Sequence, residues 1–361
     1  MTAKERVIAA LSGRPTDRPP VVIPGGMMSG ATSELLSRAG VDWERANREP
    51  EAMALLAATV QAATGVDNVG VPFCMTVEAE ARGSEVVLGS PLFPPRIERE
   101  AYEDLPIGTP TARGGRLQVV VEAVRILAEQ ARDVAVVGNV VGPVSLGAMV
   151  VAPGRFIRAL RRQPEAAESF LGALTEFLTE FALAQVEAGA DAVVVAEPTG
   201  TGQILGPADF QRFVLPFLNR ICAAIRHKGA RAVVHICGQI RAIAQQAAML
   251  AADALSVDAT AEVAALRRAG CQVPLMGNVS TFLLHHGPAE EVRRAAQRAC
   301  EQGFAIIAPA CGLSGATPTA HLSALVSGAQ QQGRRSQDRT DPPCPQENVP
   351  KGGENRGTQT P

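Results

Sequence analysis

The sequence carries no excess charge of either sign and no long apolar run. Lys and Arg total 34 and Asp and Glu total 36 among 361 residues, so the net charge of −2 gives no basic field for nucleic acid or an anionic membrane. The longest apolar runs, such as Ala192–Ala196, are far shorter than the roughly 20 residues that cross a bilayer. The first residues show no apolar segment before a small-residue cleavage site, so we expect no secretion signal.

Cysteines are few, scattered and odd in number, which is not the disulfide framework of a small secreted domain. They are Cys74, Cys222, Cys237, Cys271, Cys300, Cys311 and Cys344. No Gly-x-Gly-x-x-Gly follows any apolar run and no Walker-type loop is present, which argues against a dinucleotide or P-loop nucleotide site. We therefore expect a cytoplasmic α/β enzyme without a nucleic-acid or membrane partner.

What the sequence does contain is a repeat of short β-branched runs, each followed by a helical stretch. Near-continuous apolar strands that alternate with helices predict a parallel sheet covered by helices. Eight such units over about 310 residues favour a closed (β/α)₈ barrel of the TIM type in a single domain, with a doubly wound sheet as the rival. The eight runs are Pro20–Gly25, Asn68–Met75, Asp133–Gly142, Ala190–Pro198, Ala230–Gly238, Asp253–Asp258, Val273–Val279 and Phe304–Gly312.

Two helices are predicted most clearly, over Pro164–Gly189 and over Pro207–Gly229, the second with a kink at Pro216. Glu78–Tyr102 is predicted to hold a surface hairpin or excursion. We assign residues 1–330 to the barrel and 331–361 to a disordered tail, because the tail is rich in Pro, Gly and charge and has almost no apolar residue to bury.

The most informative pattern is the set of polar residues at the carboxyl ends of the predicted strands, where such barrels build their active sites. His235 and Cys237 are two residues apart on one strand, so their side chains point to the same face, and Cys311 ends the last strand. One imidazole and two thiolates with a fourth position open describe a catalytic zinc site. Packing residues or a Cys237–Cys311 redox disulfide are the alternatives, since free cysteines are often buried.

Other residues at the same ends are candidates of lower specificity. Glu197 is either a polar cap for the following loop, or a ligand or proton acceptor, and Asp258 has the same ambiguity. The remaining candidates for substrate contacts are Met27, Met28, Cys74 and Asn278. The two methionines are equally compatible with core packing.

Several stretches together resemble the uroporphyrinogen decarboxylase superfamily. They include GRPTDRPPVVIPGG, VPFCMTVEAEARGSEV, VVHICG and IIAPACGLSGATP, and the likeness runs from about Lys4 to Ser327. Within the superfamily they look most like the zinc-dependent methylcobamide:coenzyme M methyltransferases. The sharpest element is His-x-Cys followed some seventy residues later by a lone Cys before a Gly-rich loop.

The resemblance implies a (β/α)₈ barrel with zinc on His235, Cys237 and Cys311. It also implies methyl transfer from a methylated corrinoid to a thiol such as coenzyme M, with Glu197 as a displaceable fourth ligand or as the acceptor of the thiol proton. The chain lacks the Asp-x-His-x-x-Gly run with which corrinoid proteins bind cobalt. The methylcorrinoid is therefore expected to arrive on a separate corrinoid protein.

Two other functions remain open. The first is decarboxylation of a porphyrinogen, but those enzymes resemble this chain without sharing its first loop. They carry an arginine-rich segment where this chain has Pro24–Ser29 with no cation, and buried carboxylates without partners are costly. The second is a non-catalytic accessory barrel of methyl metabolism, which would bind zinc without turnover.

Overall fold

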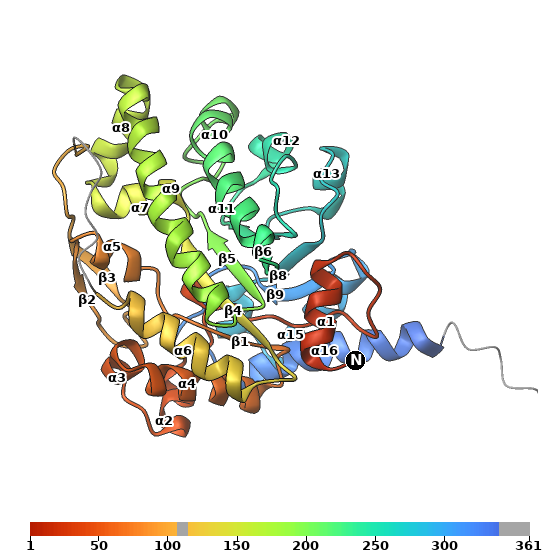
Figure 1. The fold of residues 1–361 in the computed structure, drawn as a ribbon. Helices are drawn as coiled ribbons and strands as arrows, with labels where there is room; N and C mark the ends of the chain where they lie inside the picture. Colours follow the sequence, from red (N-terminus) through yellow and green to blue (C-terminus); the bar gives the residue numbers. More distant parts are fainter. Residues whose placement is uncertain (107–114, 339–361) are drawn as a thin grey trace, which may run out of the picture.

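The barrel wall is a parallel sheet in the order β1-β4-β5-β6-β7-β8-β9 (Figure 1). The computed structural model describes residues 1–106 and 115–338, with 333–338 as backbone alone. The strands of this sheet are β1 (Asn68–Gly70), β4 (Ala135–Val141), β5 (Ala192–Ala196), β6 (Arg231–Ile236), β7 (Ala254–Val257), β8 (Leu275–Val279) and β9 (Ile306–Pro309). All seven fall inside predicted runs.

The remaining predicted run, Pro20–Gly25, closes the barrel between β9 and β1. Val22 N–H donates to the Ile307 carbonyl (2.9 Å), and Asp67 N–H donates to the Val21 carbonyl (2.8 Å). The Asp67 and Asn68 side chains complete the seam, with Asp67 Oδ2 accepting from Val21 N–H at 2.8 Å. The prediction of a closed (β/α)₈ barrel is confirmed, with side chains replacing part of the ladder at this seam.

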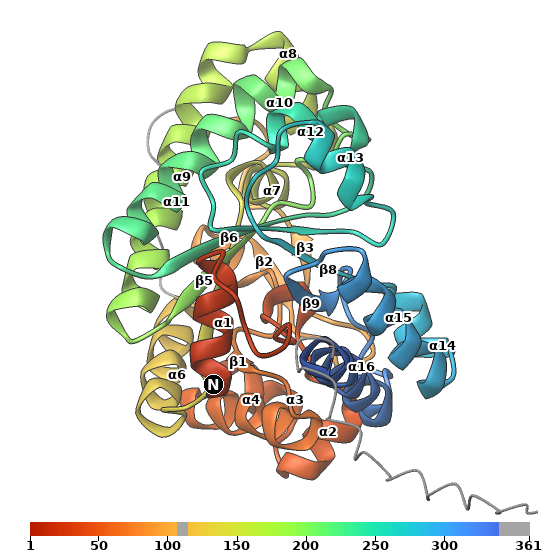
Figure 2. The same ribbon diagram turned by 90° about the vertical axis from the view of Figure 1, so that its right-hand side faces the viewer.

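The barrel lumen is packed with small and medium apolar side chains, so it is a core and not a channel. Helix α1 (Ala3–Leu11) covers the amino-terminal end of the barrel, because its Val7, Ala10 and Leu11 join the same cluster (Figure 2). The strand residues of this cluster are Val22, Ala135, Val137, Ala192, Val194, Val233, Ala254, Met276, Ile306 and Ala308. The open end is therefore the carboxyl end, where the candidate residues lie.

Helices surround the sheet, and the loops and short helices after each strand build its carboxyl end (Figure 1). The other helices are η1 (Gly26–Met28), α2 (Ser33–Ala39), α3 (Trp43–Arg48), α4 (Pro50–Thr64), α5 (Val77–Ala81), α6 (Leu117–Gln130), α7 (Pro143–Val150), α8 (Pro153–Arg162), α9 (Pro164–Glu187), α10 (Pro207–Phe213), α11 (Leu215–His227), η2 (Arg241–Ile243), α12 (Ala244–Ala247), α13 (Val263–Arg268), α14 (Thr281–His286), α15 (Ala289–Glu301) and α16 (Thr319–Asp338). No helix in the described ranges is both long and apolar enough to cross a membrane.

Three local predictions can be compared with these elements. The predicted helix over Pro207–Gly229 is two helices that break at Val214 and not at Pro216, because proline is accommodated in the first turn of α11. The predicted excursion contains a two-stranded antiparallel sheet of β2 (Glu85–Val87) and β3 (Arg96–Arg99). Helix α16 continues past the predicted boundary at residue 330, and the rest of the predicted tail, 339–361, lies outside the described residues.

Candidate metal centre

His235, Cys237 and Cys311 converge at the carboxyl end of the barrel. Their ligand atoms all lie within 4.8 Å of one another. His235 is fully buried on β6, Cys237 follows the end of that strand, and Cys311 lies two residues beyond β9. The closure of the sheet thus brings Cys311 next to Cys237, although the two are far apart in the sequence.

The two sulfurs of this cluster are 2.9 Å apart, and both cysteines are free. The contact between the two half-buried sulfurs shifts their pKa values in opposite directions. The hydrogen bond from Cys237, with His235 nearby, lowers the pKa of Cys311 to about 5. The same hydrogen bond and burial raise the pKa of Cys237 above its ordinary value. This pairing favours the thiolate of Cys311 over its thiol, and the thiolate is the form that binds metal.

The imidazole of His235 is held by one nitrogen and unpartnered at the other. Its Nδ1 lies 3.0 Å from Ser256 Oγ, while Nε2 is buried without a hydrogen-bond partner. A buried polar atom without a partner is costly, and a metal ligand removes that cost. A ring nitrogen held by a neighbouring side chain is also the usual arrangement for a metal-binding histidine. The donor set fits a zinc ion bound through one nitrogen and two sulfurs.

Asp258 and Asn278 lie at the edge of this cluster, on the ends of β7 and β8. Asp258 Oδ2 is 3.8 Å from Cys237 Sγ. Asn278 uses its amide to hold the loop after β7, donating to the carbonyls of Asp258 and Ala261 at 3.2 Å each. Asp258 therefore contacts the sulfur pair, whereas Asn278 is occupied in positioning the loop that carries Asp258.

Glu197 follows β5 and is fully buried, but it is not one of the residues in the His-Cys-Cys cluster. Its Oε2 accepts from Val144 N–H (2.9 Å), and its Oε1 accepts from the N–H (2.8 Å) and the hydroxyl of Ser145. Gly142 allows this approach, since a Cβ there would overlap the carboxylate. Burial raises the pKa of Glu197 to about 7, against the effect of these hydrogen bonds. Both carboxylate oxygens thus bind the start of α7, the helix after β4, whereas the sequence predicted a cap for the loop that follows Glu197 itself.

The remaining candidates, Met27, Met28 and Cys74, differ in how near they lie to the His-Cys-Cys cluster. Met28 belongs to the lumen core, where its side chain is 1% exposed. The carbonyl of Met27 accepts from Leu313 N–H (3.2 Å), which places Met27 beside the loop that carries Cys311. Cys74 is buried against the Arg116 guanidinium, with Sγ 3.3 Å from Nη1. Met28 is therefore a core residue, and Cys74 belongs to a separate polar network.

Three further polar residues belong to this end of the barrel. Ser256 is in register with His235 on the neighbouring strand, so their side chains share the lumen face. Asn139 occupies the lumen face of β4, and a Cβ at Gly26 would lie 2.5 Å from its Oδ1. Glu78 accepts from Val141 N–H (2.8 Å), and its burial raises its pKa to about 7. A polar residue at an alternating position of an otherwise apolar strand is the signal that identifies the first two.

The known proteins similar to this chain include methyltransferases and decarboxylases. The family model described as uroporphyrinogen decarboxylase (URO-D) matches residues 2–332. The methylcobamide:CoM methyltransferase MtaA of Methanosarcina barkeri is 31% identical over 334 residues, covering 90% of this chain and 97% of that protein. The uroporphyrinogen decarboxylase of Myxococcus xanthus is 33% identical, but over only 49% of this chain and 53% of its own length. A solved methyltransferase from Methanosarcina mazei superposes with a TM-score of 0.83 at 30% identity, covering 92% of this chain and 99% of that structure.

Proposed function

Because this chain belongs to the uroporphyrinogen decarboxylase family, we propose that it uses the barrel mouth of that family for a zinc-dependent methyl transfer. The methyl donor is a methylated corrinoid carried by a separate protein, and the acceptor is a small thiol such as coenzyme M. The observation that carries this proposal is the convergence of His235, Cys237 and Cys311 with an unpartnered Nε2. A porphyrinogen decarboxylase has no use for such a donor set.

The methyltransferase branch is favoured over the decarboxylase branch by two further observations. The similarity to a methylcobamide:CoM methyltransferase extends over nearly the whole chain, whereas the similarity to a decarboxylase covers about half of it. The loop after the first strand segment, Pro24–Ser29, contains no cation to pair the carboxylates of a porphyrinogen. A substrate with many carboxylates would therefore be bound poorly here.

His235, Cys237 and Cys311 are the residues that would hold the metal. Zinc bound there would accept the thiol substrate as a further ligand and favour its deprotonation to a thiolate at neutral pH. The two cysteine thiolates would balance the charge of the ion, which would limit how strongly the substrate sulfur is held. Ser256 fixes the orientation of the His235 ring through Nδ1, so that Nε2 stays available as a ligand.

The chemistry at the substrate is a displacement at carbon. The substrate sulfur forms a bond to the methyl carbon, and the cobalt–carbon bond breaks with its electron pair staying on cobalt, which gives cob(I)alamin and a methyl thioether. The proton of the thiol is released to solvent. Glu197 acts in this proposal as a positioning residue, because its carboxylate holds the start of α7.

Two measurements on the purified protein test the proposal. Elemental analysis is expected to give one zinc per chain, and alanine at each of the three ligands is expected to remove most of it, whereas Cys300→Ala, a half-buried cysteine outside the cluster, should keep it. Full zinc occupancy in Cys311→Ala would exclude that residue from the ligand set.

The second measurement follows the corrinoid spectrum under anaerobic conditions. Free methylcobalamin with a small thiol should lose its methyl–cobalt band slowly, and faster when the corrinoid is bound to its carrier protein. Uroporphyrinogen should be unchanged in the same mixture. Consumption of uroporphyrinogen without demethylation of methylcobalamin would establish the decarboxylase function instead. Zinc binding with neither reaction would favour the accessory barrel.

A further inference from the structure

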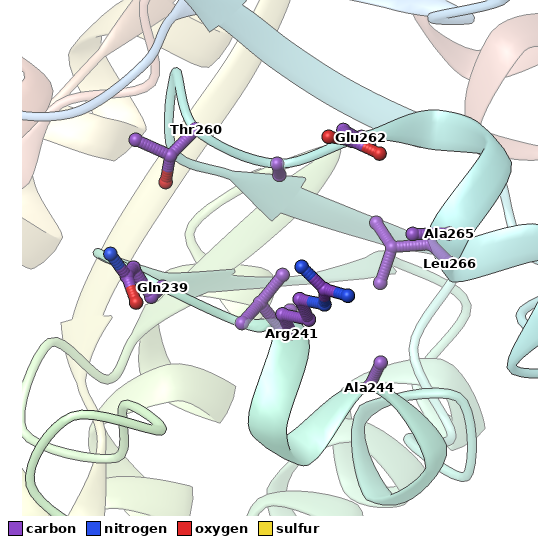
Figure 3. A pocket seen from close by; sticks show the side chains of 9 residues that line it. Gln239, Arg241, Ala244, Thr260, Glu262, Ala265 and Leu266 are labelled. Atoms are coloured by element: carbon purple, nitrogen blue, oxygen red, sulfur yellow. The ribbon is translucent and has the colours of Figure 1, made fainter.

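A polar cavity of about 220 Å³ lies beside the metal centre, between the loops that follow β6 and β7 (Figure 3). Gln239 and Arg241 line it from the first loop, and Thr260 and Glu262 line it from the second. Its apolar walls are Ile240, Ala244, Ala261, Ala265 and Leu266. The cavity therefore combines polar groups from two loops with an apolar lining, and its volume suits one end of a small molecule.

One carboxylate connects this cavity with the sulfur pair. Asp258 Oδ2 is 3.8 Å from Cys237 Sγ, and Asp258 Oδ1 accepts from the hydroxyl of Thr260 at 3.4 Å. Because both contacts are made by one carboxyl group, the Thr260 hydroxyl lies within about 10 Å of the sulfur. A four-carbon amino-acid thiol measures about 5–6 Å from its sulfur to its carboxyl group. The polar side chains that line the cavity extend toward the thiol and span the rest of the distance to its charged end.

Two exposed side chains of opposite charge, Arg241 and Glu262, line this cavity. Within the described residues, Arg241 and Glu262 form neither an ion pair nor a side-chain hydrogen bond. Figure 3 shows Arg241 on the first loop and Glu262 on the second, on opposite sides of the cavity. The Asp258 carboxylate accepts from the Thr260 hydroxyl but is not itself part of the lining. The cavity thus offers one positive group on one wall and negative charge on the other.

We propose that this cavity binds the charged end of an amino-acid thiol such as homocysteine. Its carboxylate would pair with Arg241, and its ammonium group would pair with Glu262. The inference rests on the proposed function, since the thiol end is assigned to the metal centre. A sulfonate thiol satisfies Arg241 only and leaves Glu262 beside an anion, whereas a zwitterion satisfies both charges. The acceptor would then differ from the CoM that names the methanogen relatives.

The test compares three thiols with the zinc-loaded protein and methylcobalamin: homocysteine, 2-mercaptoethanesulfonate and uncharged 2-mercaptoethanol. The wild type should have its highest kcat/KM with homocysteine. Arg241→Gln should raise the KM for both charged thiols by about tenfold or more, and Glu262→Gln should raise it for homocysteine alone. The KM for 2-mercaptoethanol should stay unchanged in both variants. Arg268→Gln and Glu301→Gln, exposed residues that do not line the cavity, are the matched controls.

A binding measurement separates this inference from the proposed function. Calorimetric titration of metal-free protein with methionine, the methylated product, should show binding that Arg241→Gln and Glu262→Gln each weaken by about tenfold. Methionine binding that neither variant alters, or a wild-type preference for the sulfonate thiol, would overturn the inference. If 2-mercaptoethanol is methylated, the proposed function holds whether or not the amino-acid site is supported. If no thiol is methylated while methionine binds as expected, the proposed function fails and the amino-acid site remains.

Discussion

Replacing Glu197 with glutamine distinguishes a structural role, in which the carboxylate holds the start of α7, from a role on metal or substrate. The substitution keeps the size of the side chain but turns one acceptor oxygen into a donor NH₂ group. At least one donor, from Val144 or Ser145, then loses its acceptor. A buried donor without a partner costs about 1–3 kcal/mol in the free energy of unfolding.

The pH dependence of that cost follows from the raised pKa of Glu197. Its folded-state pKa of about 7 lies above the ordinary value of 4.5, so the folded wild type binds this proton more tightly than the unfolded chain. The wild type therefore has this stabilisation below about pH 4.5 and loses it as the pH rises through 7. The loss is about 3 kcal/mol in the free energy of unfolding. The glutamine variant does not show this loss, because glutamine does not titrate.

Urea unfolding at pH 5 and pH 8 measures both effects. At pH 5 the variant should be less stable than the wild type by about 1–3 kcal/mol, and by pH 8 this difference should shrink to nearly zero or reverse. Glu51→Gln, an exposed carboxylate on α4, is the control and should change neither value. Zinc content and kcat should stay within about twofold of the wild type, because the carboxylate faces α7. A hundredfold fall in kcat with no change in stability would refute the capping role.

Three further outcomes are expected. Ser256→Ala should lower zinc affinity by about 10- to 100-fold, because it removes the partner of His235 Nδ1. Metal titration at fixed pH measures this affinity, and an unchanged value would show that the ring is held by other contacts. Asp67→Asn should lower the free energy of unfolding by about 3–5 kcal/mol, since the Asp67 carboxylate pairs with Arg6 and Arg18 at 2.8 Å in the barrel seam. Chemical denaturation measures this change, with the exposed Glu51→Gln variant as the reference. Removing residues 339–361 should leave the melting temperature and activity unchanged, because their composition offers little apolar surface; a fall of several degrees would contradict the predicted tail.

The sequence determined the architecture of this protein, because the period of its apolar residues is a local property. Runs such as Ala192–Ala196 are β-branched and apolar, and a strand of that kind is buried on both faces of a helix-covered parallel sheet. The His-x-Cys spacing likewise predicted that His235, in β6, and Cys237, just after it, point to one face, without knowledge of any other strand.

Tertiary structure decided which residues meet across the mouth and which are engaged elsewhere. Closure of the sheet brought Cys311 next to Cys237 and left Nε2 of His235 unpartnered, which no local pattern can show. It also engaged both oxygens of Glu197 at the start of α7, because the turn after β4 presents N–H groups there. Ser256 became the partner of His235 only through the register of β6 and β7. Charge pairing and metal geometry depend on distances between strands, and those distances are set by the closed barrel.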